Sequence, residues 1–308
     1  MNLKSLNIPV IDFVGRRKYA MIFSATLLII SIASIGLQGL KFGIDFTGGT
    51  LIELGYEKTA DLDSIRSKLS SADFKGTNVQ YFGSDTEVLI QLEPQTASSA
   101  QISSSVIRML GEGVDVRRVE FVGPKVGEEL TNDGGLAMLY ALIGILIYVA
   151  FRFEYRFALG SIVALIHDVT ITLGIFSILK IEFDLTVLAA ILAVIGYSLN
   201  DTIVVFDRIR ENFLATRHVE PEPIINEALN QTLSRTLMTS LTTLLVLFAL
   251  FYLGGEVIHS FAGALLIGVV IGTYSSIYVA STTVLAMGIS KEDMLPSEKE
   301  KKEIDARP

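Results

Sequence analysis

The chain has 308 residues, of which 50% are hydrophobic and only 19% are charged, against about 25% charged residues in soluble domains. Together with a mean hydropathy of +0.52, this composition predicts an integral membrane protein. The absence of cysteine excludes disulfides, thiolate metal sites and cysteine catalysis, and the net charge of −8 comes without any Lys/Arg run typical of nucleic-acid binding.

Six apolar runs are long enough to be transmembrane helices. They cover residues 19–37, 134–151, 157–179, 185–206, 236–253 and 260–287. Lys and Arg in short loops mark the cytoplasmic side. Six spans put these residues on one side: Lys4, Arg16, Arg17, Lys18, Arg152, Arg156, Arg208, Arg210, Arg217 and Lys291. We therefore expect residues 1–18 and both termini in the cytoplasm, and the first span as a retained anchor rather than a cleaved signal peptide.

Residues 38–133, between the first two spans, are polar enough to fold in water on the external side. Their pattern predicts strands at 50–56, 78–82, 87–92 and 114–122, and amphipathic helices at 61–72 and 98–110. The order strand-helix-strand-strand-helix-strand is typical of a ferredoxin-like unit. The predicted fold class is an α-helical polytopic membrane protein with six transmembrane helices and one external α+β ferredoxin-like (βαββαβ) domain.

Glycine-containing joints flank this domain at residues 43–50 (GIDFTGGT) and 121–127 (FVGPKVG). Gly48 and Gly49 predict a tight turn with positive φ. Neither joint is followed by a P-loop, so we interpret both as structural joints rather than nucleotide sites.

The second to sixth spans are predicted to form a five-helix bundle over residues 134–289, and the third span carries His167 and Asp168. A charge near mid-membrane costs at least ~2.5–3.5 kcal/mol, so intramembrane ionisable residues are usually functional. Both residues are therefore candidates for proton or ion handling. Because adjacent helical residues point about 100° apart, the two cannot face the same neighbour. A relay from Asp168 to Asp201 and an internal hydrogen bond of His167 both remain open.

The fourth span carries Asp201, about 8 Å from its cytoplasmic end at 1.5 Å per residue. Arg235 opens the fifth span on the same side, so the two side chains can meet. Arginine favours the charged carboxylate that burial disfavours, which allows protonation to switch when the arginine moves. The alternative is a static salt bridge. The face of the helix that contains Asp201 also carries Val194, Tyr197, Ser198 and Val205. Neighbouring Asn200 is expected to pair with an adjacent helix.

Residues 223–234, between the fourth and fifth spans, predict a helix that lies along the cytoplasmic interface, because their apolar side chains share one face. The alternative is a helix packed on the protein's own underside. Residues 290–308 alternate Lys and Glu without apolar content and are predicted to be a disordered cytoplasmic tail.

Several of these motifs together resemble one family. They are GIDFTGGT after the first span, VEFVGPKVG before the second, HDV in the third, VIGYSLNDTIVVFDRIREN in the fourth and QTLSRTL entering the fifth. They resemble the SecF subunits of the bacterial SecD–SecF protein-export complex over residues 15–291. They are similar, more distantly, to half of a resistance-nodulation-division transporter.

The resemblance implies a non-enzymatic subunit without cofactor or metal that spans the lipid bilayer of the inner membrane. It would pair with SecD beside the SecYEG channel and use the proton-motive force to help unfolded preproteins cross; YajC and YidC are further candidate partners. The family's proton-responsive aspartate falls on Asp201 and its essential arginine on Arg235. The external domain would be periplasmic.

Two rival functions were weighed. An intramembrane aspartyl protease would need Asp168 and Asp201 to share a proton, but their predicted depths differ by about 8 Å. A small-molecule or lipid exporter of the same superfamily would need a larger external pore domain than residues 38–133 supply. Residues and spacing alone leave proton and sodium coupling both open.

Overall fold

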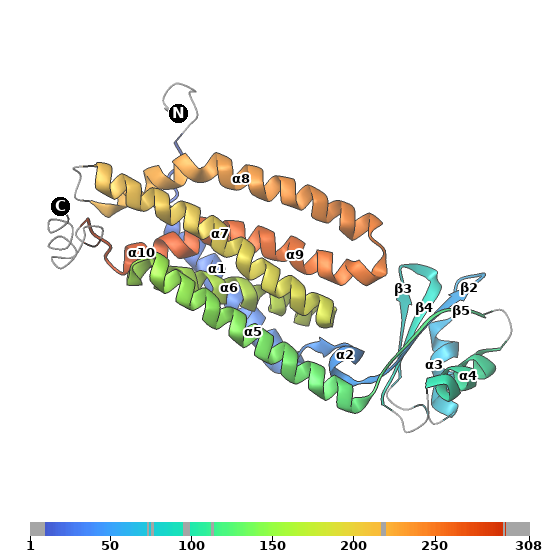
Figure 1. The fold of residues 1–308 in the computed structure, drawn as a ribbon. Helices are drawn as coiled ribbons and strands as arrows, with labels where there is room; N and C mark the ends of the chain where they lie inside the picture. Colours follow the sequence, from blue (N-terminus) through green and yellow to red (C-terminus); the bar gives the residue numbers. More distant parts are fainter. Residues whose placement is uncertain are drawn as a thin grey trace.

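The computed structural model describes residues 10–72, 74, 77–94, 99–111, 114–216, 220–291 and 293. Figure 1 shows a bundle of long helices with a small sheet-containing domain at one end. Six helices in the described residues are long and apolar enough to cross a membrane, so the predicted polytopic helical architecture is confirmed. They are α1 (Arg17–Gln38), α5 (Pro124–Arg152), α6 (Tyr155–Leu179), α7 (Leu185–Ala215), α8 (Pro221–Leu253) and the span Ile258–Ala286.

The last span is built from three consecutive helical pieces: α9 (Glu256–Ser275), a π-helical turn η2 (Ser276–Ala280) and α10 (Ser281–Ala286). The π-turn inserts extra backbone into the helix, a feature that often accompanies functional sites. It begins directly after Ser275, a buried residue discussed below.

Two helices continue well beyond the predicted spans. Helix α5 begins at Pro124 rather than at residue 134, because Gly123 and Pro124 suit the first positions of a helix. Helix α7 continues to Ala215 rather than ending at residue 206. In both cases the hydropathy pattern marks only the apolar part of a helix that also has a polar extension.

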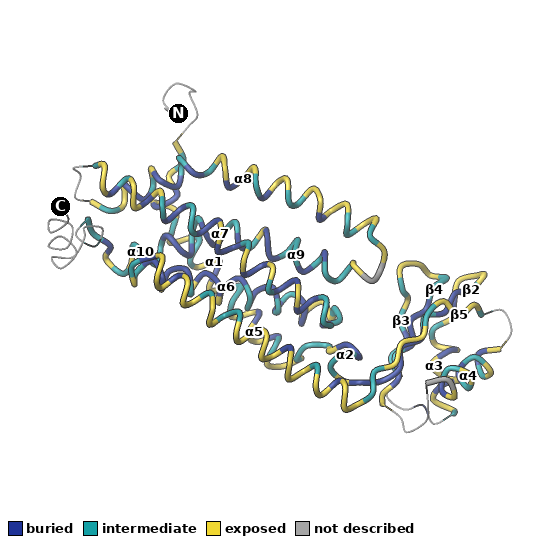
Figure 2. The backbone as a smooth tube through the Cα atoms, in the orientation of Figure 1, coloured by how far each residue is buried: buried dark blue, intermediate teal, exposed yellow. Residues whose placement is uncertain are grey.

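The bundle has a central and a peripheral set of helices. About half of the apolar stretches of α6, α7 and the last span is buried (50%, 56% and 50%), against 17%, 11% and 17% for α1, α5 and α8. Figure 2 shows the same contrast as dark central and pale outer segments. The largest buried side chains of the bundle include Phe157, Phe176, Phe206 and Phe213, which belong to α6 and α7.

The small domain consists of β2 (Gly49–Tyr56), α3 (Leu62–Ser71), β3 (Asn78–Phe82), β4 (Ser84–Leu92), α4 (Ser99–Leu110) and β5 (Val114–Val122). The strand order in the sheet is β3-β4-β2-β5, and every neighbouring pair is antiparallel. The two helices pack on one face of the sheet around a core that includes Ile52, Leu54, Leu69, Ile90 and Val106.

The two glycine joints contact each other where the small domain meets the bundle. Gly48 and Gly49 have φ of 69° and 131°, so the predicted tight turn is present. A Cβ added to Gly127 of α5 would lie 2.8 Å from the Gly48 nitrogen, so the two backbones approach closely. The interpretation as structural joints is consistent with this packing.

The same joint reaches the start of α7. Asp184 caps this helix by accepting the backbone N–H of Val187 at 2.8 Å. Asp45, in the short helix α2 (Ile44–Thr47), accepts the backbone N–H of Leu185 at 3.1 Å. Nearby, β1 (Lys41–Phe42) pairs in parallel with β6 (Glu182–Phe183). The joint between the small domain and the bundle is therefore tied to α7.

The structure differs from the prediction of a separate interfacial helix at residues 223–234. These residues form the first part of α8, which continues without a break to Leu253. The reason is local. The only prolines of α8 are at positions 221 and 223, in its first turn, and no glycine or proline between residues 234 and 236 breaks the helix. The predicted apolar face is buried inside the protein, as the alternative interpretation had it.

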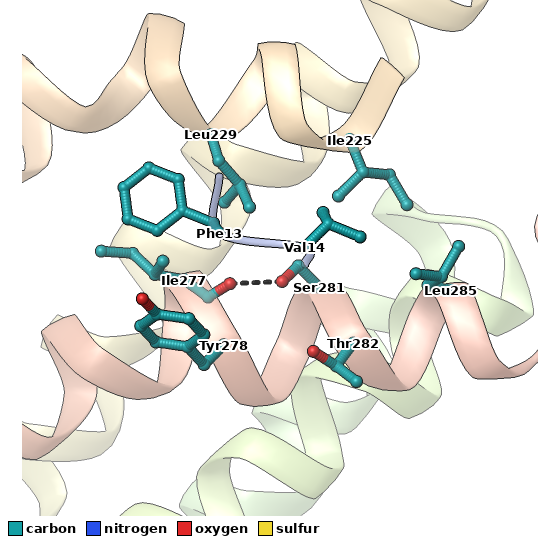
Figure 3. A pocket seen from close by; sticks show the side chains of 9 residues that line it. All are labelled: Phe13, Val14, Ile225, Leu229, Ile277, Tyr278, Ser281, Thr282 and Leu285. Atoms are coloured by element: carbon teal, nitrogen blue, oxygen red, sulfur yellow. Dashed lines mark hydrogen bonds between the residues drawn. The ribbon is translucent and has the colours of Figure 1, made fainter. Parts of the chain in front are cut away.

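Figure 3 shows what covers that face: Phe13 and Val14 lie between Ile225 and Leu229 of α8 and the last span. Asn226 accepts the N–H of Phe13 at 2.8 Å. One turn further along α8, Asn230 exchanges two hydrogen bonds with the backbone of Ile11, at 2.9 and 2.8 Å; the other lining residues are Ile277, Tyr278, Ser281, Thr282 and Leu285. The predicted tail, residues 290–308, lies almost wholly outside the described residues.

Candidate ion-coupling site

Asp201 is buried in the middle of α7, with 3% of its surface exposed. Its Oδ2 atom has no hydrogen-bond partner. A buried carboxylate oxygen without a hydrogen bond costs free energy of folding, so its presence indicates a functional rather than a purely structural role. Four of the five residues predicted to share a face of this helix are buried: Val194, Ser198, Asp201 and Val205.

Arg235 and Asp201, whose side chains were expected to be able to meet, do not form an ion pair with each other. The Arg235 side chain is exposed at the start of the apolar part of α8, and the described residues include no contact pair between the two. The reason is helical periodicity: Thr236 is the residue that this turn of α8 buries, so Arg235 points aside. A static salt bridge is therefore absent from this structure.

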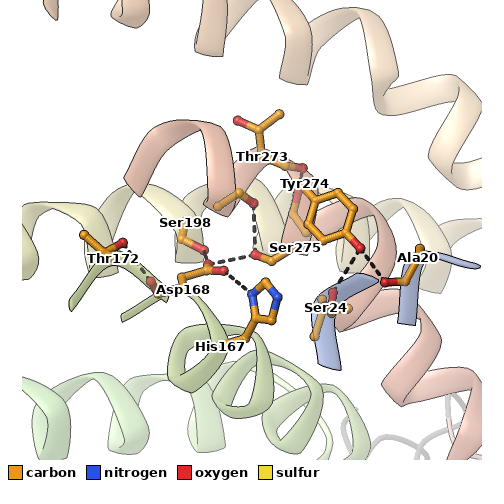
Figure 4. A network of polar contacts seen from close by, with 12 residues as sticks. Ala20, Ser24, His167, Asp168, Thr172, Ser198, Thr273, Tyr274 and Ser275 are labelled. Atoms are coloured by element: carbon orange, nitrogen blue, oxygen red, sulfur yellow. Dashed lines mark hydrogen bonds and ion pairs between the residues drawn. The ribbon is translucent and has the colours of Figure 1, made fainter. Parts of the chain in front are cut away.

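Asp168 and His167 form a buried polar network, drawn in Figure 4. The exposed fractions of the two residues are 0% and 2%. Nδ1 of His167 lies 2.9 Å from Oδ1 of Asp168, while Oδ2 accepts the hydroxyls of Ser198 at 2.5 Å and Ser275 at 2.7 Å. The Asp168 carboxylate thus has three partners from α6, α7 and α9, whereas Asp201 has an unpaired oxygen.

The network continues toward α1. The His167 ring stacks on Tyr274, with the ring centroids 6.1 Å apart. The Tyr274 hydroxyl donates to the carbonyl of Ala20 at 2.7 Å and lies 2.9 Å from Ser24 Oγ. His167 thus has an internal hydrogen bond, made to the neighbouring Asp168.

Ser198 is the link between the two aspartates. It donates to Asp168 and lies one helical turn before Asp201 on the same buried face of α7. The two carboxylates themselves are not hydrogen-bonded to each other in the described residues, which is not the shared-proton geometry of an aspartyl protease. Asn200 is exposed rather than paired with an adjacent helix of this chain.

Sequence reasoning missed several residues of the site. Ser275, Tyr274 and Ser24 were not singled out, although each carries a hydroxyl group in an apolar span. Single hydroxyls are common in membrane helices because they bond to their own backbone, so only the packing shows which ones serve a network. No group of three or more His, Asp or Glu side chains suited to a metal ion occurs among the described residues.

The network makes a stability prediction. Asp168→Ala is expected to lower the free energy of unfolding by about 1–3 kcal/mol or more, because it leaves His167 and two serine hydroxyls buried without their acceptor. Asp207→Ala is the matched control: its ion pair with Arg152 lies at the surface, with both side chains 37% exposed, so less than about 1 kcal/mol is expected. Thermal unfolding in detergent, followed by circular dichroism, measures both. Equal melting temperatures for the two variants would contradict the prediction.

The fold and these buried groups define a class of protein: a polytopic helical membrane protein with a small α+β domain between its first two spans and ionisable residues inside its bundle. Residues 102–290 match the family model of the C-terminal region of SecD/SecF protein export membrane proteins, and residues 33–60 match the SecD/SecF GG motif. The chain belongs to this SecD/SecF family.

Relatives named protein translocase subunit SecF align along nearly their whole length. The Vibrio alginolyticus protein is 53% identical over 97% of both chains, and the Pseudomonas aeruginosa protein is 45% identical over 100% of both. The SecF of Escherichia coli O157:H7 is 46% identical over 96% of this chain and 94% of its own.

Two solved SecDF structures share the fold. The Thermus thermophilus SecDF, a translocon-associated membrane protein, is 40% identical with a TM-score of 0.84, and the match covers 91% of this chain. A SecDF in a super-membrane-facing form gives a TM-score of 0.68 at 37% identity and covers 97% of this chain. The chain spans only 39% and 40% of the length of these solved proteins.

Proposed function

We propose that the protein is an accessory subunit of the Sec translocase that, together with SecD, promotes preprotein translocation across the bacterial inner membrane at the expense of an ion gradient. The observation that carries the assignment to translocation is the 53% identity to a SecF over 97% of both chains. The observation that carries the coupling role is Asp201, a buried carboxylate in a membrane span with an unpaired oxygen.

The coupling residues would be Asp201 and Arg235, supported by Asp168 and His167. Since Asp168 already has three hydrogen-bond partners, we assign it to holding α6, α7 and α9 together and to orienting Ser198. Asp201 is the group whose charge changes. A change at Asp201 has a mechanical route to the external domain, because the N-terminus of α7 is bonded to Asp45 of the joint.

SecD is the proposed partner, with the SecYEG channel, YajC and YidC as candidates beyond it and unfolded preprotein as the substrate. The solved SecDF chains support a second half, since this chain accounts for 39% of the first of them. Within residues 185–206 of α7, the exposed residues form one stripe: Ala189, Ala193, Gly196 and Asn200. A Cβ at Gly196 would have no neighbour within 4 Å. Small residues at this spacing allow close helix approach, and an exposed amide at this depth needs a partner.

Purification in mild detergent tests the partnership. We expect stoichiometric recovery with a second polytopic protein of similar topology, identified by mass spectrometry of the bound chains. Recovery of a stable, active homodimer that lacks such a partner would contradict the proposal.

We assign the small domain to the ferredoxin-like class and to the periplasm, with both termini in the cytoplasm. The element order and the antiparallel strand order β3-β4-β2-β5 support the class. The Lys and Arg residues of the short loops support the orientation.

Cysteine labelling tests this orientation, because the chain has no cysteine of its own. A cysteine at Ser84, which is exposed at the start of β4, is expected to react with a membrane-impermeant maleimide added to spheroplasts. A cysteine at Glu220, which is exposed just before α8, is expected to react only after the membrane is opened. The reverse pattern would overturn the assigned topology.

A further inference from the structure

Thr236 differs from every other threonine of α8. The hydroxyls of the other four donate to a backbone carbonyl four residues earlier in their own helix: Thr232, Thr239, Thr242 and Thr243. Threonine has two accessible rotamers in a helix, and this back-bond is the usual way to satisfy a hydroxyl in an apolar span. The Thr236 hydroxyl is buried, with the residue 1% exposed, yet it has no partner. Among the described residues of α8, Thr236 is therefore the threonine that lacks this back-bond.

The register between α7 and α8 shows what lies opposite. The Tyr197 hydroxyl donates to Ser240 Oγ at 3.3 Å, which fixes the level at which the two helices face each other. The helices run in opposite directions, as Figure 1 shows, so one turn after Tyr197 on α7 corresponds to one turn before Ser240 on α8. Those positions are Asp201 and Thr236.

The two unpaired atoms are chemically complementary. Oδ2 of an ionised Asp201 can only accept hydrogen bonds, and the Thr236 hydroxyl has one hydrogen to donate. Neither atom has a hydrogen-bond partner among the described residues, so they are not hydrogen-bonded to each other. A single water molecule with two to four polar partners is the group that satisfies both.

We propose that Thr236 and Asp201 together form a binding site for one water molecule, through which the proton reaches the Asp201 carboxylate. A hydronium at this site transfers its proton to Oδ2, which leaves a neutral carboxyl group and a water bonded to the Thr236 hydroxyl. Thr236 is thus a positioning residue of the coupling site. This inference rests on the proposed coupling role of Asp201 and specifies the coupling ion as the proton.

Three variants isolate the hydroxyl. Thr236→Val keeps the shape of the side chain and removes the donor, while Thr236→Ser keeps the donor. Thr232→Val is the matched control, since Thr232 is buried one turn earlier but bonds to Ala228 of its own helix at 3.0 Å. Each variant is purified with its co-purifying partner and reconstituted in liposomes, and its abundance is compared with that of the wild type.

Infrared difference spectroscopy on acidification reads the proposed contact directly. The carbonyl band of protonated Asp201 is identified by its loss in Asp201→Asn. Loss of a hydrogen bond to a carboxyl group raises its carbonyl stretching frequency, so we expect a shift to higher frequency in Thr236→Val. The band should keep its wild-type position in Thr236→Ser and Thr232→Val.

Gradient-stimulated export should fall about tenfold or more in Thr236→Val alone, the factor expected for the loss of one hydrogen bond to a charged group.

The outcomes separate this inference from the proposed function. A wild-type band in Thr236→Val, together with lost stimulation in Asp201→Asn, overturns the water site and leaves the coupling role intact. Full stimulation in Asp201→Asn overturns the coupling role itself. If Thr236→Val does not accumulate, Thr236→Ala, which is smaller and creates no steric conflict, is expected to show the same band shift. Stimulation that follows a sodium gradient and is equal in wild type and Thr236→Val also overturns the proposal.

Discussion

Asp201→Asn is expected to abolish gradient-stimulated preprotein export while the protein still inserts, pairs and accumulates normally. Asparagine has nearly the volume of aspartate and keeps most of its hydrogen-bonding capacity, but it cannot ionise. It therefore mimics the neutral state permanently. Because Asp201 has an unpaired oxygen and no ion pair among the described residues, removal of its charge leaves none of those residues without a partner. Export into inverted membrane vesicles, with and without a gradient and at matched protein levels, measures the effect.

Further variants of Asp201 and Arg235 distinguish a coupling role from a structural role. Arg235→Ala should give a similar loss, because a positive charge in the neighbourhood of a carboxylate favours its ionised form. Asp201→Glu should retain part of the stimulation because it keeps a titratable group. A structural salt bridge would instead predict that Arg235→Ala lowers protein abundance, at a cost of about 3–5 kcal/mol, and that Asp201→Asn combined with Arg235→Gln restores both abundance and export. Full stimulation in Asp201→Asn vesicles would leave Asp201 a structural residue.

The second large effect is expected from Gly268→Ala, in the contact between α7 and α9. A Cβ at this position would lie 2.1 Å from Cγ2 of Val194, whose branched side chain has little freedom to move. The next turn is also close, since a Cβ at Gly272 would lie 2.9 Å from that of Ser198. We expect a loss of about 1–3 kcal/mol from overpacking. This would outweigh the gain of about 1 kcal/mol that alanine normally brings to a helix in place of glycine.

Gly144→Ala is the matched control for this prediction. Gly144 lies in the interior of the transmembrane helix α5, but a Cβ there would have no neighbour within 4 Å. Its substitution should leave the melting temperature unchanged or raise it slightly. Circular dichroism melts of the two variants in the same detergent decide the matter, and a Gly268→Ala variant as stable as Gly144→Ala would show that α7 and α9 are not in close contact. Displacement of Ser198 should also weaken export, because Ser198 connects Asp168 with the Asp201 region.

Much of the fold was predictable because apolar runs of bilayer length leave few alternatives. All six spans were found in this way, and strict alternation and helical periodicity placed the strands and helices of the small domain within a few residues of β2 to β5. The interfacial helix was predicted wrongly. Amphipathic periodicity shows that one face of residues 223–234 is apolar, but it does not show what covers that face. In the folded protein it is Phe13 and Val14, more than two hundred positions away in sequence.

The sequence by itself determined which ionisable groups of this protein lie inside the membrane: a charge in an apolar span is so costly that His167, Asp168 and Asp201 stand out without any coordinates. Only the tertiary structure decided how they differ. Helix packing surrounds Asp168 with Ser198, Ser275 and His167, and leaves Asp201 with an open oxygen opposite Thr236. Hydrogen bonds act over about 3 Å, and the rotation of one helix against another sets which hydroxyls come that close. No local pattern in the chain encodes that rotation.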